Sequence, residues 1–138
     1  HRRFHSDSTG CDVIRPMLSY RHQFHAGNVS DVFKHALLCR LLLALGRKDK
    51  PYFVLDTHAG LGLYDLQHDW SEKTVEWRKG IARVFGRSDA PEALRPYLDA
   101  VRAENPDGNL RFYPGSPRIT RRLMRDNDRL ALCELNRD

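Results

Sequence analysis

The sequence predicts a doubly wound α/β fold, in which helices cover a parallel sheet, and three observations support this class. An apolar run ends at Asp56 and is followed by a turn that contains Gly60 and Gly62. Amphipathic segments come next, and a second apolar run ends at Glu134. The order of strand, glycine turn, helix and strand is that of the first part of such a sheet. Ligands of this class bind at the carboxyl ends of the strands, where both acids and the glycine turn are expected to lie.

The first helix is expected to begin at Asn28 or Ser30, because either side chain can cap it. It is expected to run to about Leu45, with Gly46 at its end. Its apolar stripe consists of Val29, Val32, Phe33, Ala36, Leu37, Leu41 and Ala44. Residues 52–56 then form the first strand.

The middle of the chain is expected to be helical. Residues 72–85 and 91–104 have amphipathic patterns, and the second of these begins with proline, as helices often do. Residues 110–113 form a short extended piece.

The last part returns to the pattern of a helix followed by a strand. Ser116 is a good N-cap with Pro117 behind it, and the basic helix that they open is expected to end near Arg125. Residues 130–134 form the second strand.

The composition is that of one soluble domain with a basic balance. The chain has 138 residues, 41% of them hydrophobic and 30% charged, and a net charge of +5 that permits a nucleic-acid partner. Its three cysteines are scattered, which argues for a reducing compartment and against disulfides or a zinc site. The longest apolar run, residues 36–45, is too short to span a bilayer. We therefore expect a cytoplasmic protein, without a membrane segment.

The two ends of the chain have different characters. Residues 1–16 are polar and aperiodic, so they are expected to be a tag or a disordered tail, and Met17 reads like a native start. The chain stops at Asp138, immediately after the second strand.

The glycine turn favours one class of ligand. A dinucleotide site would have a third glycine where this chain has Asp65, and Glu134 lies much further on than the acid of such a site. These features disfavour a nicotinamide enzyme, which is kept as an alternative. An acid, two glycines and a late second acid suit a nucleoside without a pyrophosphate, which S-adenosylmethionine provides. The same pattern also occurs in purely structural turns.

Four segments carry a wider resemblance. They are "MLSYRHQFHAGNVSDVFKH", "KPYFVLDTHAGLGLYDL", "RFYPGSP" and "LCELNRD". Over residues 17–138 the chain resembles the RlmJ family of bacterial 23S rRNA adenine-N6 methyltransferases. The resemblance implies a Rossmann-like, S-adenosylmethionine-dependent methyltransferase fold, with an incomplete sheet in this chain. It places residues 17–64 and 111–138 in the methyltransferase domain and residues 65–110 in a small helical insertion.

The resemblance also implies four cofactor contacts: His35, His58, Ser116 and Glu134. Glu134 can accept hydrogen bonds from both ribose hydroxyls. Ser116 can present a hydroxyl and helix amides to a carboxylate. His58 lies in the ligand-facing turn, and Asp31 can orient His35 from one helical turn away. The alternatives are a structural, partly buried His35 and a Ser116 that is simply an N-cap.

On the RNA side, the basic and aromatic segment 20–25 is the best candidate. Tyr20 can stack on a base and His22 can meet phosphate, and Lys34 joins them as a further RNA contact. The alternative is a solvated tail. A metal site at His22, His25 and His35 lacks any fixed ligand spacing, so no metal is expected. Arg118, Arg121, Arg122 and Arg125 add positive charge, mostly as a solvated face.

The chain lacks the D/N-P-P-Y motif with which such enzymes hold the flipped adenine. It therefore looks like the amino-terminal half of the enzyme, itself inactive, and no catalytic residue is assigned. We expect a monomer. The alternative function is a catalytically inactive RNA-binding module of Rossmann-like fold.

Overall fold

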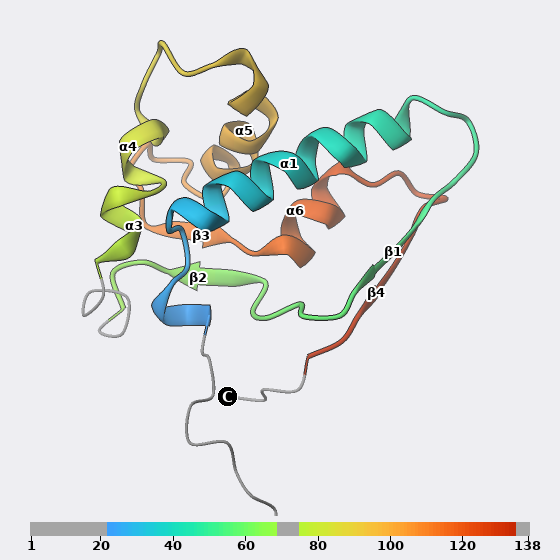
Figure 1. Cartoon of the computed structure of the whole chain (residues 1–138), viewed down its shortest axis with the longest axis horizontal. Helices are drawn as coiled ribbons and strands as arrows, with labels where there is room; N and C mark the ends of the chain where they lie inside the picture. The colour runs from blue at the N-terminus through green and yellow to red at the C-terminus, as the bar shows by residue number, and fades with distance from the viewer. Residues whose placement is uncertain (1–21, 69–74, 135–138) are drawn as a thin grey trace, which may run out of the picture.

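The computed structural model describes residues 22–68 and 75–134 (Figure 1). Two small sheets are present in these residues, a parallel pair of β1 with β4 and an antiparallel pair of β2 with β3. Helices α1 and α6 pack against each other on one side of the parallel pair (Figure 1). The predicted combination of helices with a parallel pair of strands is confirmed. Among the residues described, no helix combines the length and the apolar character needed to cross a membrane.

The parallel pair consists of β1 (Phe53–Asp56) and β4 (Arg129–Leu132). Both predicted strands are confirmed, with bounds shifted by one or two residues. Asp56 lies opposite Leu132, and the Cys133 backbone N–H donates to the Asp56 carbonyl at 2.8 Å. The two strands therefore end at the same edge, as parallel neighbours do.

The antiparallel pair contains a strand that the sequence does not predict. Strand β2 (Leu63–Asp65) pairs with β3 (Phe112–Pro114), and Tyr64 faces Tyr113 across the ladder with both side chains buried. A three-residue strand is too short to show a period of two, so only its partner reveals it. Next to the pair, the Leu66 N–H donates to the Arg111 carbonyl at 2.8 Å, so two positions far apart in the chain lie side by side.

Helix α1 (Val29–Gly46) is capped by Asn28, whose side chain accepts a hydrogen bond from the Asp31 backbone N–H at 2.9 Å. The predicted helix is confirmed, and Asn28 rather than Ser30 is its cap. The side chains that it buries are Asp31, His35, Ala36, Cys39 and Leu42.

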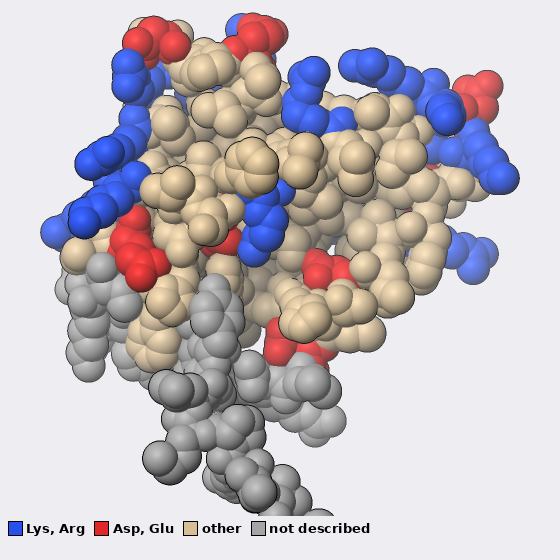
Figure 2. Space-filling model, in the orientation of Figure 1, with Lys and Arg blue, Asp and Glu red and all other residues tan. Residues whose placement is uncertain are grey.

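The apolar stripe predicted for α1 is buried only in part: Ala36 is buried and Val32 is half-buried against the core. Val29, Phe33, Leu37 and Leu41 are 63%, 73%, 55% and 57% exposed. Uncharged side chains dominate the middle of the face in Figure 2, where α1 runs, and Lys and Arg gather toward its margins. The side chains that α1 turns inward in this chain include Asp31 and His35, which make polar contacts there.

The single helix predicted over residues 72–85 is wrong where the structure describes it. Residues 76–85 form two short helices, α3 (Glu76–Lys79) and α4 (Ala82–Phe85), separated at Gly80. A Cβ on Gly80 would lie 2.1 Å from the Gly27 carbonyl oxygen. The break therefore lets the backbone between α3 and α4 lie directly against the turn that precedes α1.

The second predicted helix is confirmed, with a tighter first turn. A 3₁₀ turn, η2 (Glu92–Leu94), leads into α5 (Arg95–Ala103). The largest fully buried side chains belong to α5, β3, α6 and the segments around them: Tyr97, Tyr113, Leu66, Ile81, Leu98 and Ile119. The core therefore lies between the helices, and the parallel pair stands at its edge.

Helix α6 (Ser116–Leu123) ends two residues before its predicted limit. Arg125 lies beyond it and donates to the backbone carbonyls of Gly46, Lys48 and Lys50 at 3.2, 2.7 and 3.2 Å. Asp128 pairs with the same guanidinium at 3.0 Å. The Arg125 side chain is thus a clamp on the loop between α1 and β1, and not part of a solvated basic face.

Candidate functional site

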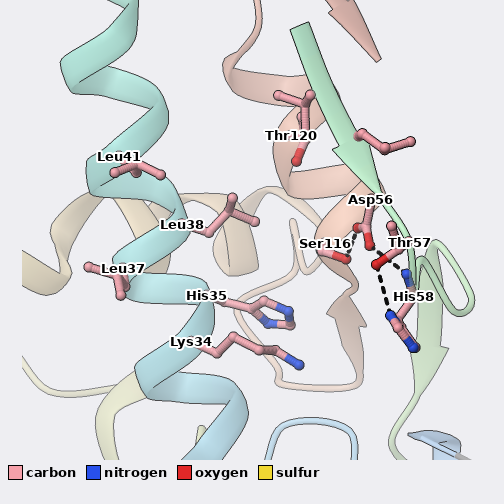
Figure 3. A pocket seen from close by; sticks show the side chains of 12 residues that line it. Lys34, His35, Leu37, Leu38, Leu41, Asp56, Thr57, His58, Ser116 and Thr120 are labelled. Atoms are coloured by element: carbon pink, nitrogen blue, oxygen red, sulfur yellow. Dashed lines mark hydrogen bonds between the residues drawn. The ribbon is translucent and has the colours of Figure 1, made fainter. Parts of the chain in front are cut away.

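A pocket of about 410 Å³ opens between α1, the carboxyl end of β1 and the first turns of α6 (Figure 3). Its volume is within the range of small-molecule sites. The polar side chains in its wall are Lys34, His35, Asp56, Thr57, His58, Ser116 and Thr120. Leu37, Leu38, Leu41, Val54 and Leu55 supply the apolar part. Three of the four predicted cofactor contacts therefore share one cavity.

Asp56 organises the strand end of this pocket. Its carboxylate accepts a hydrogen bond from the Ser116 hydroxyl at 2.5 Å and from the His58 backbone N–H at 3.2 Å. Thr57 Oγ1 lies 2.9 Å from His58 Nδ1 (Figure 3). A single carboxylate thus joins the turn after β1 to the start of α6.

Ser116 does not cap α6, and that part of the prediction is wrong. Gly115 occupies the cap position without a side-chain hydrogen bond, and Ser116 is the first helical residue. A Cβ at Gly115 would lie 2.4 Å from the Leu61 carbonyl oxygen. The close backbone contact favours glycine at the cap, which leaves the Ser116 hydroxyl to bind Asp56 on the pocket side.

Glu134 follows β4 and lies at the glycine turn, outside the wall of the cavity. The Gly60 backbone N–H donates to Glu134 Oε2 at 2.5 Å, and the Ala59 N–H donates to the Cys133 carbonyl at 3.0 Å. Gly60 has φ of +62°, the left-handed region that favours glycine. The ends of β1 and β4 thus hold an exposed carboxylate beside the turn.

His35 is oriented by a different residue from the one predicted. Its Nδ1 lies 2.7 Å from the Tyr113 hydroxyl, and the residue is only 2% exposed. Asp31 instead accepts hydrogen bonds at Oδ2 from His22 Nε2 at 2.7 Å and from the Gly27 N–H at 3.0 Å. The predicted orientation of His35 by Asp31 through a hydrogen bond is therefore corrected.

Burial and neighbouring charges determine the protonation states of His35 and Asp31. Burial lowers the pKa of His35 to about 4, against the opposing effect of the Asp31 carboxylate, so the imidazole is neutral at neutral pH. Burial raises the pKa of Asp31, but the His22 hydrogen bond and the nearby His35, His22 and Lys34 charges outweigh it and lower that pKa to about 2. Asp31 is the anion of the pair.

The residues predicted to contact RNA are placed as follows. Lys34 lines the pocket, and its Nζ lies 3.1 Å from Asp31 Oδ1. His22 opens the 3₁₀ turn η1 (His22–Phe24), binds Asp31 and meets the Tyr64 ring edge-on at 5.6 Å between centroids. Tyr20 lies outside the described residues. In residues 22–68 and 75–134, no group of three or more His, Cys, Asp or Glu side chains could hold a metal ion.

Sequence reasoning missed the residues that support the site. The sequence predicts Asp56 as a strand end but not as the acceptor for Ser116, and it places Tyr113 in an extended piece without a role in the site. The His35–Tyr113 contact spans 78 residues, so no local pattern could reveal it. The one local signal for this contact is the position of Tyr113 directly before the "PGSP" residues.

Comparisons with known proteins agree on one family. A family model described as "Ribosomal RNA large subunit methyltransferase D, RlmJ" matches residues 49–138. The chain is 49% identical over 120 residues to Ribosomal RNA large subunit methyltransferase J of Escherichia coli (strain K12), and 46% identical over 121 residues to that of Haemophilus influenzae. Each alignment covers 87% of this chain and 43% of the relative.

A solved structure supports the fold of the same region. The crystal structure of protein LPL1258 from Legionella pneumophila matches with a TM-score of 0.76 and 42% sequence identity. The match covers 82% of this chain and 41% of that one. The chain thus spans less than half the length of each of these three proteins.

Proposed function

Because the chain belongs to the RlmJ family of ribosomal RNA large subunit methyltransferases, we propose that the complete protein methylates N6 of an adenine in 23S rRNA, with S-adenosylmethionine as the methyl donor. We also propose that this chain contributes the first strands and helices of a Rossmann-like sheet, and that the enzyme acts in the cytoplasm. One observation carries the proposal. The parallel ends of β1 and β4 bring the glycine turn, Asp56 and Glu134 together beside a pocket that His35, His58 and Ser116 line.

The residues present fit this cofactor, which supplies an electrophilic methyl group when bound. Glu134 is an exposed carboxylate at the end of the second parallel strand, where ribose hydroxyls can donate to it. Gly60 leaves the backbone accessible beside it. Ser116 stands at the start of α6, where helix N–H groups favour a carboxylate such as that of the methionine part. His35 and His58 then face the same space from opposite walls (Figure 3).

The experiment that tests the proposal uses the complete protein and 23S rRNA from cells that lack the modification. Transfer of a labelled methyl group to adenine N6, together with calorimetric binding of S-adenosylhomocysteine and none of NAD, is the expected result. Binding of the RNA without turnover would contradict the enzymatic function and support the alternative, a catalytically inactive RNA-binding module. Binding of NAD without binding of S-adenosylhomocysteine would support the alternative of a nicotinamide-dependent enzyme.

On the RNA side, we propose that Tyr20 stacks on the extruded adenine and that His22 and Lys34 lie with it beside the RNA. The His22–Asp31 hydrogen bond anchors the chain to α1 only two residues after Tyr20. Tyr20 itself lies outside the described residues, so its proposed role rests on the resemblance and on the position of His22 and Lys34 beside Asp31.

The Tyr20→Ala substitution in the complete enzyme is expected to depress methyl transfer about 5- to 150-fold, because stacking on one base is worth about 1–3 kcal/mol. Affinity for S-adenosylhomocysteine should stay within about 2-fold, since the cofactor contacts lie on other residues. Single-turnover methylation and calorimetry measure the two quantities. Tyr20→Phe, which keeps the ring, is the matched control and should remain close to the wild type. Unchanged turnover of the alanine variant would contradict the stacking role.

A further inference from the structure

A chain of three buried side chains leads from the core to the pocket. The Tyr97 hydroxyl lies 3.1 Å from the Tyr113 hydroxyl, which in turn lies 2.7 Å from His35 Nδ1. Both tyrosines are 0% exposed. The His35 ring extends from α1 toward Ser116 and His58 (Figure 3). Since Nδ1 is occupied by Tyr113, Nε2 is the nitrogen left for the pocket.

The number of polar hydrogens in the Tyr97–Tyr113–His35 series restricts which group donates to which. A neutral imidazole carries one N–H, and the two phenols carry one O–H each. In the part of the chain that the structure describes, the Tyr97 hydroxyl has no hydrogen-bond partner besides Tyr113, and Tyr113 has none besides Tyr97 and His35. The three groups must therefore satisfy their hydrogens among themselves and the pocket.

Only one arrangement gives both buried hydroxyl hydrogens an acceptor. If Tyr97 donates to Tyr113 and Tyr113 donates to His35 Nδ1, the imidazole hydrogen is on Nε2 and faces the pocket. If His35 Nδ1 instead donates to Tyr113, the two hydroxyl hydrogens share a single O···O contact and one of them is left buried without an acceptor. A buried donor of that kind disfavours the second arrangement by about 5- to 150-fold in population.

We propose that Tyr113, whose hydroxyl lies beside that of Tyr97, is a positioning residue that holds His35 with its hydrogen on Nε2, so that the ring is a hydrogen-bond donor toward the pocket. The atom that His35 meets is then an acceptor of the cofactor, such as a carboxylate or ribose oxygen. This assignment of the ligand atom rests on the proposed function, but the state of the ring does not.

The charges around the ring agree with this direction. Asp31, Lys34, His22 and Asp56 are the charged or titratable groups that act on His35. Lys34 shares the pocket wall with it. The Asp56 carboxylate lines the same pocket, and a donor N–H on Nε2 suits a pocket that carries such an acceptor.

The ring can be observed directly in the complete protein without any ligand. Long-range ¹H–¹⁵N correlation spectra distinguish the two neutral tautomers, and the His35 signals are those that disappear in the His35→Gln variant. The expected result is a protonated Nε2 and an unprotonated, hydrogen-bonded Nδ1. A protonated Nδ1 in the wild type would overturn the proposal, whatever the variants do.

Two conservative variants test the direction of the hydrogen bonds between Tyr97, Tyr113 and His35. Tyr113→Phe should move the Nδ1 resonance to that of a nitrogen without a hydrogen bond and weaken S-adenosylhomocysteine binding about 2- to 10-fold. Tyr97→Phe is the matched control, because Tyr113 can still donate, and both the tautomer and the affinity should stay within about 2-fold. A switch of tautomer in Tyr97→Phe would overturn the assigned direction. Failure of the wild type to bind S-adenosylhomocysteine would count against the proposed function alone.

Discussion

Replacing Glu134 by alanine in the complete protein is expected to weaken binding of S-adenosylhomocysteine about 10- to 150-fold. Hydrogen bonds from two hydroxyls to a charged acceptor contribute about 1.5–3 kcal/mol, and the variant loses them. The position of the carboxylate supports this result, because Glu134 lies at the end of β4 and touches the Gly60 N–H of the glycine turn. Calorimetry on the complete protein measures the affinity.

Two further variants separate binding from structure at this position. Glu134→Gln keeps an acceptor for the Gly60 N–H but loses the charge, so its affinity should fall between those of the wild type and the alanine variant. Glu92→Ala removes the same charge from an exposed ion pair with Arg95 and should leave the affinity unchanged. Because Glu134 is exposed, its loss should hardly change the denaturation midpoint. Wild-type affinity in a folded alanine variant would remove Glu134 from the site.

The Gly80→Ala substitution is expected to lower the free energy of unfolding by about 1–3 kcal/mol, the usual cost of forcing extra atoms into a packed region. The added Cβ would lie 2.1 Å from the Gly27 carbonyl oxygen and 2.6 Å from the Asn28 carbonyl carbon. Both are backbone atoms next to the cap of α1, so no side chain can rotate away. The same carbonyl of Gly27 accepts from the Ile81 N–H at 2.9 Å, and this contact would also be disturbed.

Urea denaturation of the complete protein measures the effect of this substitution. Gly86→Ala is the matched control, because the same methyl group at the end of α4 would meet nothing within 4 Å. Its midpoint should equal or slightly exceed that of the wild type, since alanine restricts the unfolded chain. Equal midpoints for the two variants would show that the insertion does not pack on the turn before α1 as described.

Parts of the site could be predicted because they depend on local chemistry. The strand that ends at Asp56, the glycine turn and the acid after the second strand are visible in the order of residues, and they predict a ligand at the strand ends. His35, His58 and Ser116 were expected on the cofactor side and line one pocket. Nothing local determines their partners, however, and Ser116 binds Asp56 across 60 residues.

The face of α1 shows where hydropathy is insufficient. Val29, Phe33, Leu37 and Leu41 form the most apolar stripe, yet the helix buries Asp31 and His35. Burial of polar groups is favourable only when they are hydrogen-bonded, and their partners come from the turn before the helix and from β3. The sequence carries both sets of residues but does not say which set finds partners.

The sequence by itself therefore determined the α/β class, the order of the principal elements and the residue types at the strand ends, because periodicity, capping and turn chemistry act between near neighbours. The tertiary structure decided which face of α1 is buried, where the insertion breaks at Gly80 and which atom of His35 faces the pocket. Each of these depends on contacts between segments tens of residues apart, such as the 78-residue separation of His35 and Tyr113. Only the packed chain brings such groups within hydrogen-bonding distance, and that is the physical reason for the division.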